Sequence, residues 1–210
     1  PGGISFDAAG NLWVANTFSV IEYTPAQLAA ATTSGGNTTP TPAAYLSSLA
    51  DTAAADSGNL NPVSYNYVAF DASGNLWVSV TASTNATLYA DSVLEFTKSQ
   101  LGQLTSNATP TAAYRITETS QQSAAFLQFG AIAFDSNGTL WLGTNNLNAG
   151  GAVVSYPNTP AGKGGTAVTV TGPTGSFGFS LAFNPTPGSL PIYGARAATP
   201  ARAKVRTRGR

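Results

Sequence analysis

The sequence predicts an all-β fold, a β-propeller of four-stranded antiparallel blades, with about three and a half blades in its 210 residues. The first observation is a repeat: the unit Phe-Asp-x-x-Gly-x-Leu-Trp occurs three times at a constant period of 64 residues. The second is a series of short runs rich in Val, Ile, Phe, Tyr and Trp, bounded by turn residues. The third is that one strand of each unit is apolar on both sides, as in stacked sheets.

The first strand of each unit is an apolar run that ends at the repeated aspartate. Its copies lie at Ile4–Phe6, Val68–Phe70 and Ile132–Phe134, with a further copy at Leu181–Phe183. A tight turn follows, in which an aspartate can accept backbone N–H groups and a glycine can adopt the left-handed conformation. These turn residues are Asp7, Asp71 and Asp135 with Gly10, Gly74 and Gly138. Calcium binding is the alternative for the aspartates, but a single short carboxylate makes a poor calcium site.

The second strand carries all three tryptophans of the chain at one position of the repeat. Its copies are Asn11–Ala15, Asn75–Val80 and Thr139–Gly143, with a degenerate copy around Leu190–Tyr193. Within it, Leu12 and Val14 face one side and Trp13 and Ala15 face the other. We therefore expect Trp13, Trp77 and Trp141 to pack between blades rather than to stack on a ligand.

Two outer strands complete each unit. The third strand is predicted at Ser19–Tyr23, Ser92–Phe96 and Ala152–Tyr156, and the fourth at Ala43–Leu46, Ala112–Ile116 and Ala167–Val170. The connection between them begins with a matching segment in the first two units, Tyr23–Leu28 and Phe96–Leu101, that can form a helical turn. The blades therefore span residues 1–194, divided as 1–64, 65–128, 129–175 and a partial unit at 176–194.

Charge separates the repeats from the last residues of the chain. Six of the nine basic residues fall within residues 195–210, which have no apolar periodicity and are predicted to be a disordered basic tail. A nucleic-acid or membrane-surface role for this tail is open, although we favour a tail without function. The repeats themselves hold all nine acidic residues, so we expect no nucleic-acid partner.

Composition bears on the compartment of the protein. Only 9% of the residues are charged, the chain has no cysteine, and Thr, Ser, Asn, Ala and Gly are abundant. From this composition we expect an extracellular or cell-surface protein. We also expect no membrane span, because no run of about 18 apolar residues occurs. The chain starts without Met and inside a repeat, so we expect its N-terminus to be truncated.

The segment Pro1–Asn16 resembles the NHL repeat, and the units are also similar to blades of gluconolactonase-like and streptogramin-lyase-like propellers. The resemblance implies that the first strand lines a central channel, whose mouth is formed by the loops into strand one and out of strand two. It also implies a partial propeller that needs the remaining blades of a parent chain or other copies. The usual Asn-x-Arg-Ile continuation is absent, and the period is longer than that of NHL repeats.

Catalytic residue types are sparse. The chain has no histidine, which excludes a Ser-His-Asp triad and the histidine chemistry expected of streptogramin lyases in this segment. Glu22 and Glu95 occupy equivalent places in strand three, where the third unit has Ser155. We expect the two glutamates to be solvated or turn-bonded surface acids rather than a catalytic pair.

The candidate ligand-binding residues lie at the expected channel mouth. Gluconolactonase-like enzymes hold a divalent metal there with Glu, Asn and Asp side chains, so the resemblance draws attention to Asn16, Thr81, Asn85, Asn145 and Asn146. Without a carboxylate these groups bind metal weakly, and asparagines in loops usually form turns. Tyr67 and Phe129 could form a stacking floor for a ligand, but packing between blades is the favoured role.

These observations predict a non-enzymatic NHL-like scaffold that binds a protein partner or a small ligand on its loop face, without a cofactor. The alternative is a metal-dependent, gluconolactonase-like lactonase that uses calcium or another divalent metal. A further alternative is a sensor propeller of a two-component regulator, because Leu140–Thr144 resembles the Leu-Trp-Ile-Gly-Thr signature of such blades.

Overall fold

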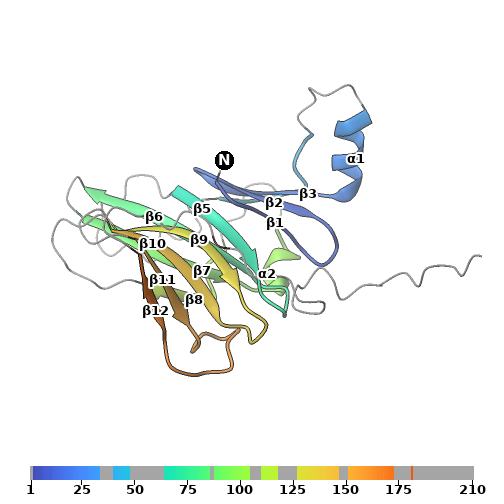
Figure 1. Cartoon of the computed structure of the whole chain (residues 1–210). Coiled ribbons are helices and arrows are strands. Elements are labelled where there is room, and N and C mark those ends of the chain that lie inside the picture. The colour runs from blue at the N-terminus through green and yellow to red at the C-terminus, as the bar shows by residue number, and fades with distance from the viewer. Residues whose placement is uncertain are drawn as a thin grey trace, which may run out of the picture.

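A computed structural model describes residues 2–33, 40–47, 64–85, 88–104, 110–117, 127–146, 151–172 and 181. The strands of this part form three four-stranded antiparallel sheets, each of which contains four consecutive strands in sequence order (Figure 1). This arrangement confirms the predicted fold class, a partial β-propeller. The predicted partial unit at 176–194, apart from Leu181, and the predicted tail at 195–210 lie outside the described residues.

The strands follow the order of the repeat. The first sheet consists of β1 (Ile4–Phe6), β2 (Leu12–Asn16), β3 (Ser19–Tyr23) and β4 (Ala44–Ser47). The second consists of β5 (Ser64–Phe70), β6 (Leu76–Asn85), β7 (Leu88–Phe96) and β8 (Tyr114–Thr117). The third consists of β9 (Leu127–Phe134), β10 (Leu140–Asn146), β11 (Ala152–Tyr156) and β12 (Thr169–Thr171).

Short helices follow strand three in the first two sheets, where the sequence predicts helical turns. They are α1 (Pro25–Thr33), which projects from the first sheet in Figure 1, and α2 (Lys98–Leu101). Thr97 caps α2 in a reciprocal arrangement, in which its hydroxyl accepts from the Gln100 N–H and the Gln100 side chain accepts from the Thr97 N–H. Gln100 also donates to the Thr111 carbonyl at 2.8 Å, which ties the helix to the segment that leads into β8.

The three sheets stack through their first strands. Strand β5 contacts β1, β2 and β3 of the first sheet, and β9 contacts β5, β6 and β7 of the second (Figure 1). One apolar core lies between the first and second sheets, with Trp13, Val20 and Leu46 on one side of it. Another lies between the second and third sheets and includes Trp77 and Ile132. The first and second sheets therefore bury their tryptophan sides against the sheet that follows, as radial packing requires.

The middle sheet is longer than the sequence predicts. Strand two was expected to end at Val80, but β6 continues to Asn85 and pairs with β7 as a two-stranded extension. The added residues are small and four of the five are polar, so they resemble a loop in sequence. In the structure they pair with the long strand β7. The first strands of the second and third sheets also begin earlier than predicted, and a register shift interrupts β5 between Tyr65 and Tyr67.

Candidate functional site

The repeated aspartate organises the turn after strand one in each sheet. Asp71 Oδ1 accepts the backbone N–H groups of Ser73 at 2.9 Å and of Asn75 at 3.0 Å. The Gly74 N–H donates to the Asp71 carbonyl, and Gly74 has a φ of 83°, in the left-handed region that glycine favours. Asp7 and Asp135 accept the equivalent backbone N–H groups. The aspartate oxygens are thus engaged inside the turn.

A hydrogen bond from the tryptophan to the same aspartate was not foreseen. Trp77 Nε1 donates to Asp71 Oδ2 at 3.0 Å, and the pairs Trp13–Asp7 and Trp141–Asp135 do so at 3.2 and 3.0 Å. The sequence signal is the constant spacing of six residues between aspartate and tryptophan. We call this arrangement the Asp–Trp clamp.

In the first two sheets, the clamped indole packs against the next sheet. The Trp13 ring packs edge-on against Phe70 with a centroid distance of 5.9 Å, and Trp77 packs in the same way against Phe134 at 5.6 Å. Trp13 and Trp77 are buried, whereas Trp141 is half-buried. A repeated polar bond therefore fixes a repeated apolar contact between sheets.

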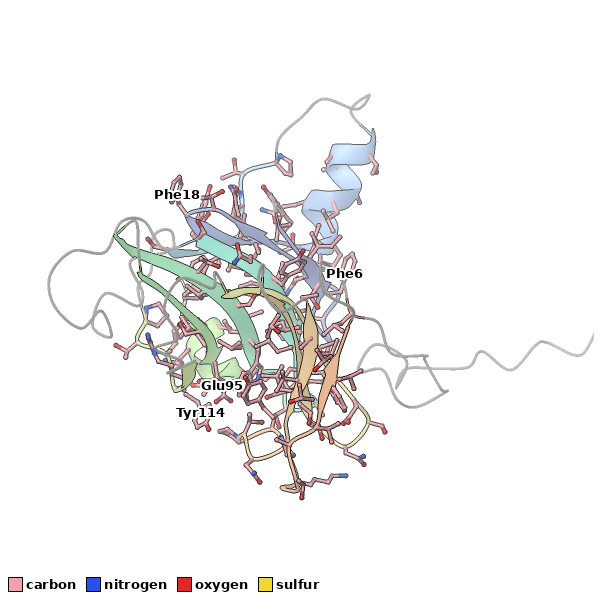
Figure 2. All side chains as sticks on the ribbon, turned by 60° about the vertical axis from the view of Figure 1, so that its left-hand side comes forward. Phe6, Phe18, Glu95 and Tyr114 are labelled. Atoms are coloured by element: carbon pink, nitrogen blue, oxygen red, sulfur yellow. The ribbon has the colours of Figure 1, made fainter. Side chains whose placement is uncertain are left out.

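Glu95 lies against the clamp of the second sheet and is buried, which differs from the surface position expected from sequence. Glu95 is only 4% exposed. It pairs with Tyr114 across β7 and β8, and both are labelled in Figure 2. Asn75 Nδ2 donates to Glu95 Oε1 at 2.8 Å and to Asp71 Oδ2 at 3.0 Å. Burial raises the pKa of Glu95, the charge of Asp71 raises it further, and the bond from Asn75 opposes this rise. The local sequence pattern does not show this burial, because Glu22 at the equivalent position is only half-buried.

The other two sheets vary this position. Glu22 is half-buried, and its pKa is raised by burial and then by the charge of Asp7. The third sheet has Ser155, whose hydroxyl accepts from the Val168 N–H at 2.7 Å. Burial acts to raise the pKa of Asp135, but hydrogen bonds from Trp141 and from the Thr139 and Asn137 N–H groups outweigh it and lower this pKa.

The candidate ligand-binding residues lie at one end of their sheets, where strand one starts and strand two stops. Asn16 ends β2, is exposed, and accepts the Thr17 N–H through its own side chain at 3.0 Å. Thr81 lies opposite Ser64 at the start of β5, and its hydroxyl accepts from Asn66 Nδ2 at 2.7 Å.

The remaining candidates lie in strands rather than in the connecting loops. Asn85 ends β6, and Asn145 and Asn146 end β10 opposite the start of β9. Phe129 belongs to β9. The side chains of Asn85, Asn145, Asn146 and Phe129 are not among those that the structure describes. The strand register brings the candidates to a common end of the sheets but does not show one assembled site.

Tyr67 packs against the core between the second and third sheets, which is the role favoured for it from sequence. Its neighbour Tyr65 is 2% exposed and donates its hydroxyl to the Ser47 carbonyl at 2.9 Å. Tyr65 thus joins the fourth strand of the first sheet to the first strand of the second. Tyr67 is half-buried, so part of its ring is accessible.

Among the described residues, no group of three or more His, Cys, Asp or Glu side chains is placed so that it could hold a metal ion. No helix among the same residues has the length and apolar character needed to span a bilayer.

Comparison with protein families gives one match. Residues 126–146 match the two component regulator propeller family. The matched segment covers β9, the third turn and β10, and it contains Leu140–Thr144, the segment that resembles the sensor-blade signature. Comparisons with curated proteins and with solved structures found no match. The family match supports a propeller-type repeat. The resemblance of the repeats to NHL and gluconolactonase-like blades stays a prediction.

Proposed function

We propose that this chain is a non-enzymatic propeller scaffold that binds a small ligand or a protein partner on the loop face where strand one starts. The observation that carries the proposal is the Asp–Trp clamp. It engages Asp7, Asp71 and Asp135 in holding turns and orienting indoles toward the next sheet. The repeated carboxylates thus serve the framework, while Asn16 and Thr81 place polar groups at the opposite end of the sheets.

A sensor propeller of a two-component regulator is the second candidate. The family match at residues 126–146 favours it. In such a sensor, the loop face takes up a signal and the stacked sheets act as a rigid support. This reading is compatible with the scaffold proposal, because both assign recognition rather than catalysis to the loop face. An extracellular or cell-surface location suits both.

The rival function is a metal-dependent lactonase, which needs a divalent cation at the channel mouth. Calcium titration with thermal melting of the full chain separates the two. A specific site raises stability by about 2.7 kcal/mol at a ligand concentration of 100 times Kd, which is several degrees for a domain of this size. The scaffold proposal predicts no shift at millimolar calcium relative to the chelator-treated protein. A saturable shift with calcium or another divalent cation would favour the lactonase.

Recognition at the loop face is tested by NMR chemical-shift mapping with monosaccharides and short peptides as probes. The expected result is saturable shifts at Asn16, Thr81 and the ends of β6 and β10. A Thr81→Val variant is expected to weaken binding, and an Asn137→Ala variant, which changes an exposed turn residue at the other end of a sheet, serves as the control. Shifts confined to the three turns, or no shifts at all, would contradict the proposal.

A further inference from the structure

The side of the first sheet that points away from the second sheet is apolar and partly open to solvent. Trp13, Val20 and Leu46 face the second sheet, so the side chains that alternate with them along each strand face the opposite way. Ile4 is 62% exposed, Phe6 is 41% exposed, and the others are half-buried. We call this set the open face, and the strand register aligns its seven members: Ile4, Phe6, Leu12, Val14, Ile21, Tyr23 and Tyr45.

The internal repeat shows that such a face is stable when an apolar sheet side lies on it. In the second sheet, the first six positions are buried because the first sheet covers them, with the Trp13 ring edge-on to Phe70. None of these six is more than 7% exposed: Val68, Phe70, Leu76, Val78, Leu94 and Phe96. At the seventh position the second sheet has Arg115 where the open face has Tyr45. The open face is thus the less charged of the two and has no described sheet on it.

A second copy of the chain can supply an apolar sheet side for this face. The Trp13 and Trp77 sides are already packed against the following sheets within each copy, so they are not free for such a contact. The open face itself is free for contact and carries no charged side chain. Glu22, the charged residue of the four strands, lies on the other side because it pairs with Trp13. Two open faces therefore meet without burying an ion or opposing like charges.

From these observations we infer that two copies of this chain pack open face to open face in a two-fold symmetric dimer. The contact is isologous, since the same patch of both copies forms it. Sheets that pack face to face in this way lie about 10 Å apart, with strand directions within about 30° of each other.

The size of the face sets the strength of the dimer. Four strands about 4.8 Å apart, each about five residues long, give it a projected area of roughly 300 Å². An apolar patch of about this size or larger marks an interaction site. Two such faces bury less than the roughly 1,200 Å² of a stable complex, so the dimer is expected to be weak and to depend on concentration.

The test measures the mass of the full chain by light scattering over a range of concentrations. The wild-type chain is expected to approach twice its 21.3 kDa mass as concentration rises and to dissociate on dilution. Phe6→Lys is expected to raise the dissociation constant at least tenfold, because the symmetry places two new charges in one apolar contact.

Two further variants separate loss of contact from loss of fold. Ile4→Lys changes the more exposed residue of the open face, so it is the milder variant for folding and is expected to weaken the dimer as Phe6→Lys does. Phe18→Lys is the matched control: Phe18 is 57% exposed, lies in the turn between β2 and β3, and is at the other end of the sheet from Phe6 (Figure 2). Circular dichroism checks that each variant keeps its β structure. A wild-type chain that stays monomeric up to millimolar concentration, or a dimer that folded Ile4→Lys leaves unchanged, would overturn the inference.

A spin label tests the symmetry of the contact. The chain has no cysteine, so Ala8→Cys carries a single nitroxide on an exposed turn residue beside the open face. The labelled chain is mixed with isotope-labelled wild-type chain, and the broadening of wild-type amide signals is measured by NMR. An isologous contact predicts broadening in β1, β2 and β3 of the wild-type copy. Broadening in β11 and β12 of the third sheet instead would show that two different surfaces meet and would overturn the two-fold dimer.

Discussion

The first and second sheets share one sequence pattern but differ in what covers them. The second sheet has a neighbour on each face, so its Phe70, Leu94 and Phe96 are nearly inaccessible to solvent. The first sheet has a described neighbour on one face only, and its equivalent Phe6 is 41% exposed. Burial in this molecule is therefore set by the neighbouring sheet more than by the repeat sequence. The equivalent residues of the two sheets form matched pairs, in which the sequence context is similar and the packing differs.

The largest expected difference concerns the aromatic residue that ends strand three. Phe96→Ala removes a side chain that is 0% exposed, and we expect it to lower the free energy of unfolding by about 3–5 kcal/mol. Tyr23→Ala, at the equivalent position of the half-buried first sheet, is expected to cost about 1 kcal/mol. Urea unfolding at a dilution where the chain is monomeric measures both. Equal losses for the two variants would contradict the difference in cover.

The next difference concerns the Asp–Trp clamp. Asp71→Ala leaves the buried Trp77 Nε1 and two turn N–H groups without their acceptor, so we expect a loss of about 2–3 kcal/mol. Asp7→Ala removes the same bonds from a more accessible turn, where water replaces part of them, and is expected to cost about 1–2 kcal/mol. Thermal unfolding gives the comparison. An Asp71→Ala loss no larger than that of the exposed substitution Ala72→Ser would remove the structural role of the clamp.

The smallest difference concerns the glutamates. Because the pKa of Glu95 is raised in the folded state, the folded chain binds more protons than the unfolded chain as pH rises from the ordinary glutamate pKa to the raised one. Stability is thus expected to fall across that interval. Glu95→Gln is expected to remove this fall and to gain up to about 1 kcal/mol at neutral pH.

The matched variant for this pH effect is Glu22→Gln. Glu22 also has a raised pKa, but it is half-buried, so a smaller gain is expected. Urea unfolding between pH 4 and pH 8 measures both substitutions. A loss of stability in Glu95→Gln at neutral pH would show that the ionised side chain is favourable there and would contradict its raised pKa.

The repeat made the sheets predictable from sequence. The constant positions of Asp7, Trp13 and their copies located the turn and the two strands beside it, because turn chemistry and apolar alternation are local properties. The bond from Trp77 to Asp71 was not predicted, although the spacing of six residues could have suggested it. The burial of Glu95 was not predicted, since Glu22 occupies the same position of the repeat and is only half-buried.

The candidate site was less predictable than the framework. The residues at positions 81–85 are small and four of the five are polar, which is typical of loops, yet they extend β6 as partners of the long strand β7. Placing Asn16 and Thr81 at one end of the sheets required only the strand order. How close such side chains come to one another depends on the angles between sheets, which no local pattern encodes.

The sheets stack through the tryptophan of one sheet and the phenylalanine of the next, and a double-mutant cycle tests this contact directly. The cycle combines Trp77→Leu with Phe134→Leu and measures the free energy of unfolding of all four proteins. Edge-on aromatic packing at 5.6 Å predicts a coupling of about 0.5–1.5 kcal/mol. The non-adjacent pair Trp13→Leu with Phe134→Leu should show no coupling. A coupling near zero for Trp77 and Phe134 would contradict the stacking of the sheets.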